Sequence, residues 1–266
     1  MTGSVTDMSW GNEAPLRAPA PAAPSRTGIH GARLRKMNSG RLLIDYFSDV
    51  LCVWAWVGQV RLDEAQAQFG AQLQVEHRFV SVYGDVWSRI RATENGSDGS
   101  PETYARKIQA VAARFAHVRL HPEVFLGVVP KSSNVAHLVL SGARIAVAQA
   151  QVEDPLGERL SRAVRALRQA FFEQGRDVGR LEVGLQVLGE TGFPLRPVEI
   201  ALSDGSAMAL LSQDFKQAEN QRVTGSPTWV LDGGRQKLFG NVGYRVIEAN
   251  LRELLSRESA RGASWC

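Results

Sequence analysis

The stretch Asp45-Tyr46-Phe47-Ser48-Asp49-Val50-Leu51-Cys52-Val53-Trp54-Ala55-Trp56-Val57-Gly58 decides how the rest of the chain is interpreted. It contains most of a short apolar and aromatic run, Leu42–Ser48, which has the length and composition of a β-strand. The polar Ser48-Asp49 step ends this strand, and a helix is predicted from about Val53 to Phe69. Cys52 therefore lies at a junction between strand and helix.

The position of Cys52 predicts a reactive thiol. A cysteine at a helix N-terminus lies near the positive end of the helix dipole and near unpaired backbone N–H groups. Both favour the thiolate over the thiol, and the thiolate is the reactive form. We therefore expect Cys52 to be a nucleophile with a lowered pKa. The alternative is a buried, unreactive cysteine that fills space in the core.

The composition is that of a globular protein with one large domain, or one domain with a sizeable insertion. The chain has 266 residues, of which 44% are hydrophobic and 22% charged, and both values are ordinary. No apolar run approaches the length that crosses a membrane. With two cysteines, Cys52 and Cys266, a disulfide scaffold of the secreted kind is excluded.

Residues 1–38 differ from the rest of the chain in composition and charge. They are rich in Ala, Pro, Gly, Ser and Arg, and they carry a net +3 of the chain's +4. We predict a disordered leader, which lacks the apolar centre of a secretory signal. A transit peptide, or a shorter product beginning at Met37, is an alternative. Because the other residues carry only +1, nucleic-acid binding has little support.

From Gly40 on, the pattern predicts a regular order of elements. Strands are expected at Leu42–Ser48, Leu73–Val80, Pro227–Asp232 and Gln236–Phe239, and a closing helix at Val242–Leu255. Thr93–Pro101 has the composition of a loop, and Asp232-Gly233-Gly234 is a hairpin turn signal. The first two strands need a parallel crossover and the last two form a hairpin, an order typical of a thioredoxin-like sheet.

The middle of the chain, from Pro101 to Pro197, is predicted to be helical. Ser100-Pro101-Glu102 suits a helix start, and further helices are expected at Ala136–Val152, Leu156–Phe171, Asp177–Thr191 and Gly205–Arg222. This middle part is too long to be a loop. We therefore predict an α/β fold with a thioredoxin-like domain at 39–100 and 199–256. A large helical insertion occupies 101–198, and a flexible tail follows at 257–266.

Four parts of the sequence resemble the DsbA-like branch of the thioredoxin superfamily, in particular its cytoplasmic FrnE-like oxidoreductases. They are Asp45–Ala55, Asn134–Leu140, Ala170–Asp177, and Val223–Asp232 with Leu238–Asn241. Together they span residues 40–256 in the order and spacing of the family. The 2-hydroxychromene-2-carboxylate isomerases and kappa-class glutathione transferases are related families. The resemblance implies a thiol–disulfide oxidoreductase with Cys52 as its reactive residue.

The sequence departs from this family at the second cysteine of the active-site motif. The oxidoreductases carry Cys-X-X-Cys at the helix start, whereas this chain has Cys52-Val53-Trp54-Ala55. A dithiol enzyme attacks with one thiol and resolves the mixed disulfide with the other. This chain keeps only the attacking thiol, so an external thiol must release it, and glutathione is the expected co-substrate. Cys266 is an alternative if the tail reaches the site.

The resemblance also assigns residues to thiol and substrate binding. Pro227 is expected to be a cis-proline facing Cys52, with the Ser226 backbone free to pair with an extended peptide or a thiol ligand. Trp54 is expected to form an apolar wall over the thiol. Asn241 stands where the related isomerases and transferases hold the γ-glutamyl end of glutathione with a Phe-Gly-Asn/Ser-Asp step. The Asp of that step is missing here.

Other residues that carry chemistry have simpler interpretations. His117 and His121 have the spacing of a helical metal pair, but no third ligand is near in sequence, so we expect no metal site. His77 is expected to be structural, and His137 to lie near the pocket. The arginines of Arg159–Arg168 are expected to form the solvated face of an amphipathic helix, with an anionic substrate site as the alternative.

Three functions are compatible with these observations. The first is a cytoplasmic monothiol oxidoreductase that uses glutathione and has no tightly bound cofactor. The second is a glutathione-dependent isomerase or transferase for a small aromatic substrate, with a pocket lined partly by Trp54 and Trp87. The third is a non-redox binding module on the same fold. We expect no nucleic-acid or membrane partner, and a homodimer is left open.

Overall fold

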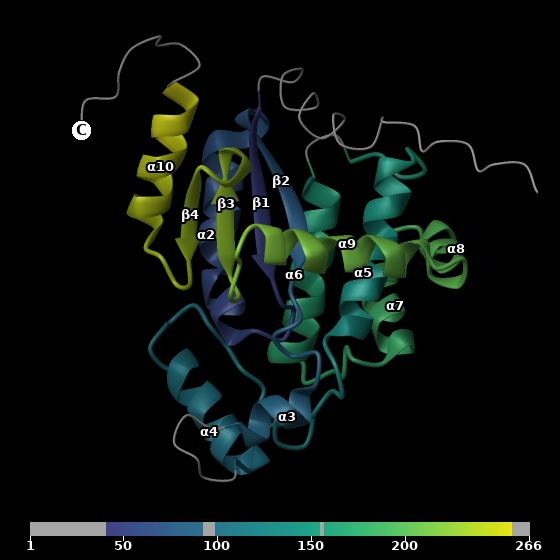
Figure 1. Ribbon diagram of the computed structural model, residues 1–266. Helices are drawn as coiled ribbons and strands as arrows, with labels where there is room; N and C mark the ends of the chain where they lie inside the picture. Colours follow the sequence, from purple (N-terminus) through teal and green to yellow (C-terminus); the bar gives the residue numbers. More distant parts are fainter. Residues whose placement is uncertain (1–40, 93–98, 155–156, 257–266) are drawn as a thin grey trace, which may run out of the picture. The chain divides into compact units, whose positions relative to one another are not determined.

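The structure is a computed structural model that describes residues 41–92, 99–154 and 157–256 (Figure 1). The predicted leader at 1–38, the predicted tail at 257–266 with Cys266, and residues 93–98 of the predicted loop lie outside the described residues.

A four-stranded mixed sheet organises the described fold (Figure 1). Its order is β2-β1-β3-β4, from β1 (Leu42–Ser48), β2 (Leu73–Phe79), β3 (Thr228–Leu231) and β4 (Gln236–Phe239). Strand β1 pairs in parallel with β2 and antiparallel with β3, and β3 pairs antiparallel with β4. The predicted α/β fold, with its parallel crossover and closing hairpin, is confirmed.

Helix α2 (Val53–Phe69) makes the crossover between β1 and β2, and α10 (Tyr244–Ser256) follows β4. The long segment between β2 and β3 is filled by α3 (Val86–Arg91), α4 (Pro101–Ala112), α5 (Asn134–Ala148), α6 (Glu158–Phe172), α7 (Leu181–Glu190), α8 (Leu195–Ser203) and α9 (Ser206–Asn220). Short 3-10 turns occupy Gly70–Gln72 and Asp232–Gly234. None of the described helices is both long and apolar enough to cross a bilayer.

The local sequence explains where several of these helices begin. Ser100 caps α4 by accepting the N–H of Thr103, and proline follows at the first helical position, as predicted. Helix α3 was not predicted, although Asp85 caps it through the N–H of Ser88. Helix α8 was also missed. Pro194 looked like a stop signal, but in the structure it is the N-cap residue of α8.

Helix α6 corrects the interpretation of its arginines. Arg162 and Arg165 are exposed, as predicted, whereas Arg168 is fully buried. The reason is helical geometry. Each residue turns the helix by about 100°, so residues spaced by three drift by about 60° at each step. Over nine residues the drift reaches about half a turn, which places Arg168 on the side opposite Arg159.

Two hydrophobic clusters meet at α2. The larger one packs the start of this helix against the helical segment, and it includes Leu51, Cys52 and Phe171. The smaller one lies between the sheet and the far end of α2 and includes Trp229 and Leu251 of α10. The turn that carries Cys52 belongs to the larger cluster, where it packs against Phe79 of β2 and residues of the helical segment.

A buried ion-pair network joins the sheet to two of the helices. Asp214 of α9 binds Arg144 of α5 and accepts a bond from Arg78 of β2 (3.2 Å). Arg78 also binds Asp45 of β1, with 2.6 Å between Nε and Oδ1. Two carboxylates thus face two guanidinium groups, and each buried charge has an opposite charge in contact, the condition for such groups to be tolerated inside a protein.

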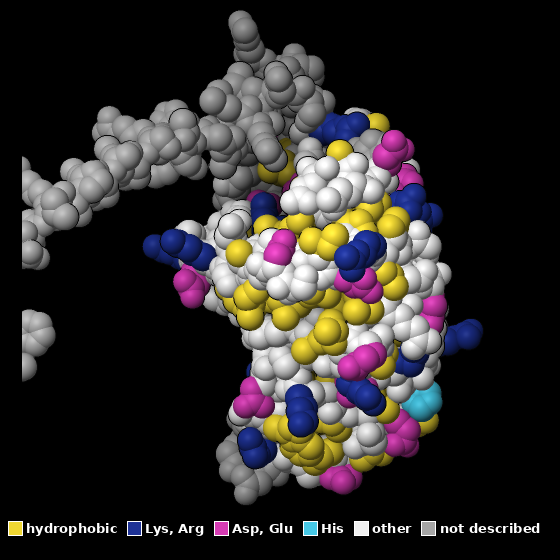
Figure 2. Space-filling view, turned by 90° about the vertical axis from the view of Figure 1, so that its right-hand side faces the viewer, with side chains coloured by type: hydrophobic (Ala, Val, Ile, Leu, Met, Phe, Trp, Pro, Cys, Tyr) yellow, Lys and Arg dark blue, Asp and Glu magenta, His cyan; other side chains and the backbone are white. Residues whose placement is uncertain are grey.

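Hydrophobic side chains gather on the face turned toward the viewer in Figure 2, on the side where α7 and α8 lie. Leu181 of α7 is 42% exposed, Ile200 of α8 44%, and Met208 of α9 54%. Apolar patches are typical of surfaces between protein chains. The homodimer considered above stays a hypothesis, for which this face is the candidate surface.

Two fully buried histidines are uncharged members of the core. His77 lies 2.9 Å from Ser161 Oγ through its Nε2, and His137 Nε2 accepts the N–H of Val50 at 3.1 Å. Burial is the main cause that lowers the pKa of each to about 3 from the usual 6.5, and the positive charge of Arg168 adds to it.

These histidines make stability depend on pH. Below pH 6.5 both gain protons when the chain unfolds, which destabilises the fold as pH falls toward 3. Buried Asp49 opposes this, because its pKa is raised from 3.8 to about 6 and it loses a proton on unfolding between these values. Between pH 6 and 4, these three groups together take up about one net proton on unfolding, which lowers stability by about 1.4 kcal/mol per pH unit as pH falls. Urea unfolding at several pH values measures this slope.

The variant His77→Gln is the control for this prediction. With one histidine removed, the remaining histidine and Asp49 balance, so the slope between pH 6 and 4 should flatten even if overall stability is lower. A His77→Gln slope equal to that of the wild type would contradict the assignment.

Candidate thiol site

The turn between β1 and α2 presents the predicted nucleophile. Cys52 is the N-cap residue of α2 in an extended conformation (φ −80°, ψ 115°). Its carbonyl oxygen accepts the N–H groups of Ala55 (3.0 Å) and Trp56 (3.1 Å), and its own N–H donates to the carbonyl of Asp49 (3.2 Å). The backbone alone makes this helix start, and the side chain of Cys52 makes no capping bond.

The sulfur of Cys52 points to the loop before β3. Cys52 Sγ donates to the carbonyl oxygen of Ser226 at 3.3 Å, across 174 residues of sequence. The Ser226–Pro227 peptide bond is cis, as predicted. In the opposite direction, the N–H of Asp49 donates to Ser226 Oγ at 2.9 Å. The structure therefore brings Cys52, Ser226 and Pro227 together through two hydrogen bonds between the loops.

The thiol itself differs from expectation. Only 5% of Cys52 is exposed, and this burial raises the pKa of its thiol above the ordinary value of 9.0. The side chain of Ser226 and the N–H groups of Ala55 and Trp54 lower the pKa, while the negative charge of Asp49 raises it. The prediction of a lowered pKa is thus wrong for this structure. The helix start acts in the expected direction, but burial outweighs it.

A buried carboxylate, which sequence reasoning missed, organises the turn. Asp49 is fully buried, and it accepts the N–H of Leu51 (2.9 Å), the N–H of Tyr83 (2.8 Å) and the hydroxyl of Ser133 (2.8 Å). Burial raises its pKa to about 6, against the lowering effect of these bonds. An aspartate between the apolar strand and Val50-Leu51 was the available signal, because a charge in such a position needs several donors.

His137 touches the same turn from α5. Its Nε2 accepts the N–H of Val50 (3.1 Å) and lies 3.7 Å from Asp49 Oδ1. The ring stacks on Phe79, with 4.8 Å between ring centroids. Because its low pKa keeps it neutral, His137 supports the turn as a hydrogen-bond acceptor and forms no ion pair with Asp49.

The side chains of the remaining predicted site residues, Trp54 and Asn241, have partners other than the sulfur. Trp54 is partly buried and meets Phe115 edge-on, with 6.3 Å between ring centroids. Asn241 Oδ1 accepts from Arg61 Nη1 of α2 at 2.6 Å, which joins this helix to the loop after β4. The hydrogen bonds of the described residues do not join Asn241 to Cys52.

The position of the missing second cysteine is filled by the methyl group of Ala55, which is fully buried. Cys52 is the free cysteine of the described residues, and Cys266 lies outside them. Internal resolution of a mixed disulfide is therefore not available within the part of the chain that the structure describes.

The histidines with metal-like spacing have separate partners. His117 Nε2 donates to the carbonyl of Val57 (3.1 Å), and His121 Nδ1 accepts the N–H of Glu123 (3.3 Å). Across residues 41–92, 99–154 and 157–256, no group of three or more His, Cys, Asp or Glu side chains is placed to hold a metal ion.

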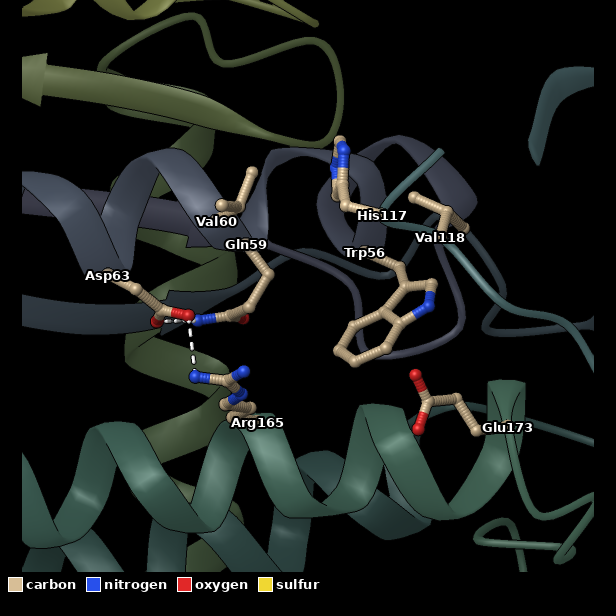
Figure 3. A pocket seen from close by; sticks show the side chains of 8 residues that line it. All are labelled: Trp56, Gln59, Val60, Asp63, His117, Val118, Arg165 and Glu173. Carbon is tan, nitrogen blue, oxygen red and sulfur yellow. Dashed lines mark hydrogen bonds and ion pairs between the residues drawn. The ribbon is translucent and has the colours of Figure 1, made fainter. Parts of the chain in front are cut away.

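A cavity of about 140 Å³ lies between α2, α6 and the segment after α4 (Figure 3). It is lined by Trp56, Gln59, Val60, Asp63, His117, Val118, Arg165 and Glu173. Asp63 accepts bonds from Gln59 Nε2 (2.8 Å) and Arg165 Nη1 (2.7 Å). A pocket lined by Trp54 and Trp87 was expected, but neither residue lines this cavity.

The family of the chain follows from its sequence. The sequence model of a family described as the DSBA-like thioredoxin domain matches residues 43–252. The chain belongs to this family. No curated protein matches the chain.

Solved structures of several DSBA-like and related proteins are similar to this one. A probable DsbA oxidoreductase from Streptomyces coelicolor has a TM-score of 0.57 and 19% identity, over 85% of this chain and 93% of its own. A 2-hydroxychromene-2-carboxylate isomerase has a TM-score of 0.56 and 17% identity, over 83% and 100%. The cytosolic disulfide reductase DsbM from Pseudomonas aeruginosa has a TM-score of 0.54 and 20% identity, over 80% and 100%. At these identities the likeness shows a shared fold.

The burial of Cys52 in this DSBA-like protein predicts a thiol that ionises only at high pH. In a Cys266→Ser background, the ultraviolet absorbance of the thiolate should rise with a midpoint above pH 9.0, because burial disfavours the charged sulfur. Circular dichroism at each pH checks that the chain stays folded. The double variant Cys52→Ser, Cys266→Ser should lack the transition, and a midpoint near neutral pH would contradict the prediction.

Proposed function

We propose that this DSBA-like protein is a monothiol thiol–disulfide oxidoreductase and that glutathione releases the mixed disulfide formed at Cys52. The contact of Cys52 Sγ with the carbonyl oxygen of Ser226 (3.3 Å) carries the proposal. It sets the sulfur beside a backbone edge that an extended peptide or a thiol ligand can pair with. The buried methyl group of Ala55, at the place of a second cysteine, supports release by an external thiol.

The proposed reaction has two exchange steps. The Cys52 thiolate attacks one sulfur of a disulfide, forms a bond to it, and displaces the other sulfur as a thiolate, which takes up a proton. A glutathione thiolate then attacks the substrate sulfur of this mixed disulfide and regenerates the Cys52 thiolate. The net exchange converts one disulfide and one glutathione into a glutathione mixed disulfide and a free thiol. When the substrate sulfur is itself glutathione, the product is oxidised glutathione.

The structure of DsbM from Pseudomonas aeruginosa with glutathione supports this choice of thiol. It has a TM-score of 0.51 and 18% identity, over 82% of this chain and 99% of its own. That protein is described as a cytosolic disulfide reductase. We propose the cytoplasm as the compartment here too, since its glutathione keeps thiols reduced. The proposal needs glutathione as a co-substrate and no tightly bound cofactor.

Intact mass measurement after treatment with oxidised glutathione tests the proposal. The wild type and Cys266→Ser should each gain one glutathione that reduced glutathione removes, because Cys52 is the exchanging sulfur. The double variant Cys52→Ser, Cys266→Ser should show no adduct. In a coupled assay with hydroxyethyl disulfide and glutathione, Cys52→Ser should fall to the uncatalysed rate, while Cys266→Ser should keep the wild-type rate. An adduct and a rate that survive in Cys52→Ser would refute the proposal.

A second candidate function is a glutathione-dependent isomerase or transferase. The observation that favours it is the protonated, buried thiol of Cys52, which donates a hydrogen bond in the structure. Such a donor can hold a bound glutathione thiolate, the role of the serine at this position in the related isomerases and transferases. Likeness to a 2-hydroxychromene-2-carboxylate isomerase agrees with this candidate.

Two substitutions at Cys52 separate the candidates. A hydrogen-bond donor is kept in Cys52→Ser and lost in Cys52→Ala, whereas both remove the exchanging sulfur. If the chain is an oxidoreductase, both variants lose disulfide exchange equally. If it is an isomerase or transferase, calorimetry should find glutathione binding retained in Cys52→Ser and weakened about tenfold in Cys52→Ala.

A further inference from the structure

Arg168 of α6 carries its charge inside the core without a carboxylate in contact. The residue is fully buried. Its Nη1 donates to Gln59 Oε1, and its Nη2 donates to Ser48 Oγ at 2.6 Å. Its Nε has no hydrogen-bond partner among the described residues. Both hydrogen-bond acceptors are neutral, so no carboxylate touches this buried charge, an arrangement that proteins generally avoid. The charges of Asp63 and Asp49 act on Arg168 only from a distance.

The contrast with Arg144 shows how unusual this is within the same fold. Arg144 is also buried, at 8% exposure, but both of its terminal nitrogens bind the carboxylate of Asp214. Arg168 has no such partner. Any negative charge that arises near it is therefore stabilised more strongly than in water, since the interior screens charges weakly.

Arg168 contacts both elements that meet at Cys52, strand β1 and helix α2. Ser48 is the last residue of β1, four positions before Cys52, and Gln59 lies on α2, seven positions after it. The guanidinium carbon also lies 6.0 Å from the centre of the Tyr46 ring. The charge is thus held between the strand and the helix whose junction presents the sulfur.

We infer that Arg168 is a positioning residue for thiol chemistry, whose buried charge stabilises the Cys52 thiolate when the sulfur leaves the Ser226 carbonyl. The inference rests on the proposed function, because an ionised Cys52 is of use in thiol exchange. Arg168 touches neither the sulfur nor the substrate groove in the described contacts, so it acts through its field.

Four other titratable groups of the described residues are coupled to Cys52. Asp49 acts opposite to Arg168 on the pKa of the thiol, and the three tyrosines have no effect while they are neutral. The four groups come from the turn, β1, the segment after β2 and α4: Asp49, Tyr46, Tyr83 and Tyr104. The charge of Asp49 raises the pKa of the thiol. A charged Cys52 in turn raises the pKa of Arg168, which burial otherwise lowers. The attraction between Arg168 and the thiolate is mutual.

The cavity of Figure 3 explains why Arg168 meets a neutral oxygen and not a carboxylate. Gln59 donates its Nε2 to Asp63 at 2.8 Å, and Asp63 also pairs with Arg165 at 2.7 Å. The amide nitrogen of Gln59 is thereby committed to the cavity side, so its oxygen faces Arg168. The carboxylate of Asp63, whose charge also acts on Arg168, is paired with the exposed Arg165.

Titration of the Cys52 thiolate by ultraviolet absorbance, in a Cys266→Ser background, tests the inference. Arg168→Met removes the charge and keeps an apolar side chain of similar length. Its midpoint should rise by about one pH unit, which is about a tenfold fall in thiolate at a fixed pH. Arg168→Lys keeps a positive charge, so its midpoint should lie between those of the wild type and Arg168→Met. Arg144→Met, which removes a compensated buried arginine, should leave the midpoint unchanged even if it lowers stability.

A second variant keeps the test decisive if Arg168→Met fails to fold. Gln59→Glu puts a carboxylate of nearly the same shape against an intact Arg168, which should raise the Cys52 midpoint in the same direction. A folded Arg168→Met or Gln59→Glu with an unchanged midpoint overturns the inference, and so does an equal shift in Arg144→Met. The readout needs no glutathione, so a missing glutathione adduct would sink the proposed function alone.

Discussion

One buried carboxylate, Asp49, holds the candidate site together. It accepts bonds from Leu51, Tyr83 and Ser133, and its own N–H donates to Ser226 Oγ. The turn after β1, the segment after β2, the residue before α5 and the loop before β3 all meet there. Removing the carboxylate would leave three donors without an acceptor in a buried place, at about 1–3 kcal/mol each. The position of the Cys52 sulfur, at the end of the same turn, depends on this one group.

The features that sequence reasoning predicted correctly have strong local signals. The order of strands follows from apolar runs separated by turn residues, and the junction before α2 follows from the polar Ser48-Asp49 step. The cis bond at Pro227 followed from a resemblance in motif and order, not from local chemistry. Helices α3 and α8 were missed because they are short, and because Pro194 can begin a helix as readily as it ends one.

The features that were missed depend on packing between distant residues. The raised pKa of Cys52 comes from burial among residues of the helical segment, which the sequence around the cysteine does not contain. The buried side of Arg168 follows from the drift of a three-residue spacing around a helix, and its acceptors lie 109 and 120 residues away in sequence. A local pattern shows which residue types are present, but the strength of an electrostatic effect depends on how far water is excluded.

The way in which Cys52 caps α2 has a mechanical consequence. The carbonyl oxygen of Cys52 accepts the first helical N–H groups, while its sulfur bonds to another strand's loop. The two roles are separate, so rotation about the Cα–Cβ bond breaks the contact with Ser226 and leaves the first turn of the helix intact. Moving the sulfur off this carbonyl therefore takes a change of rotamer, a fast and local motion, and no unwinding of the helix on which it stands.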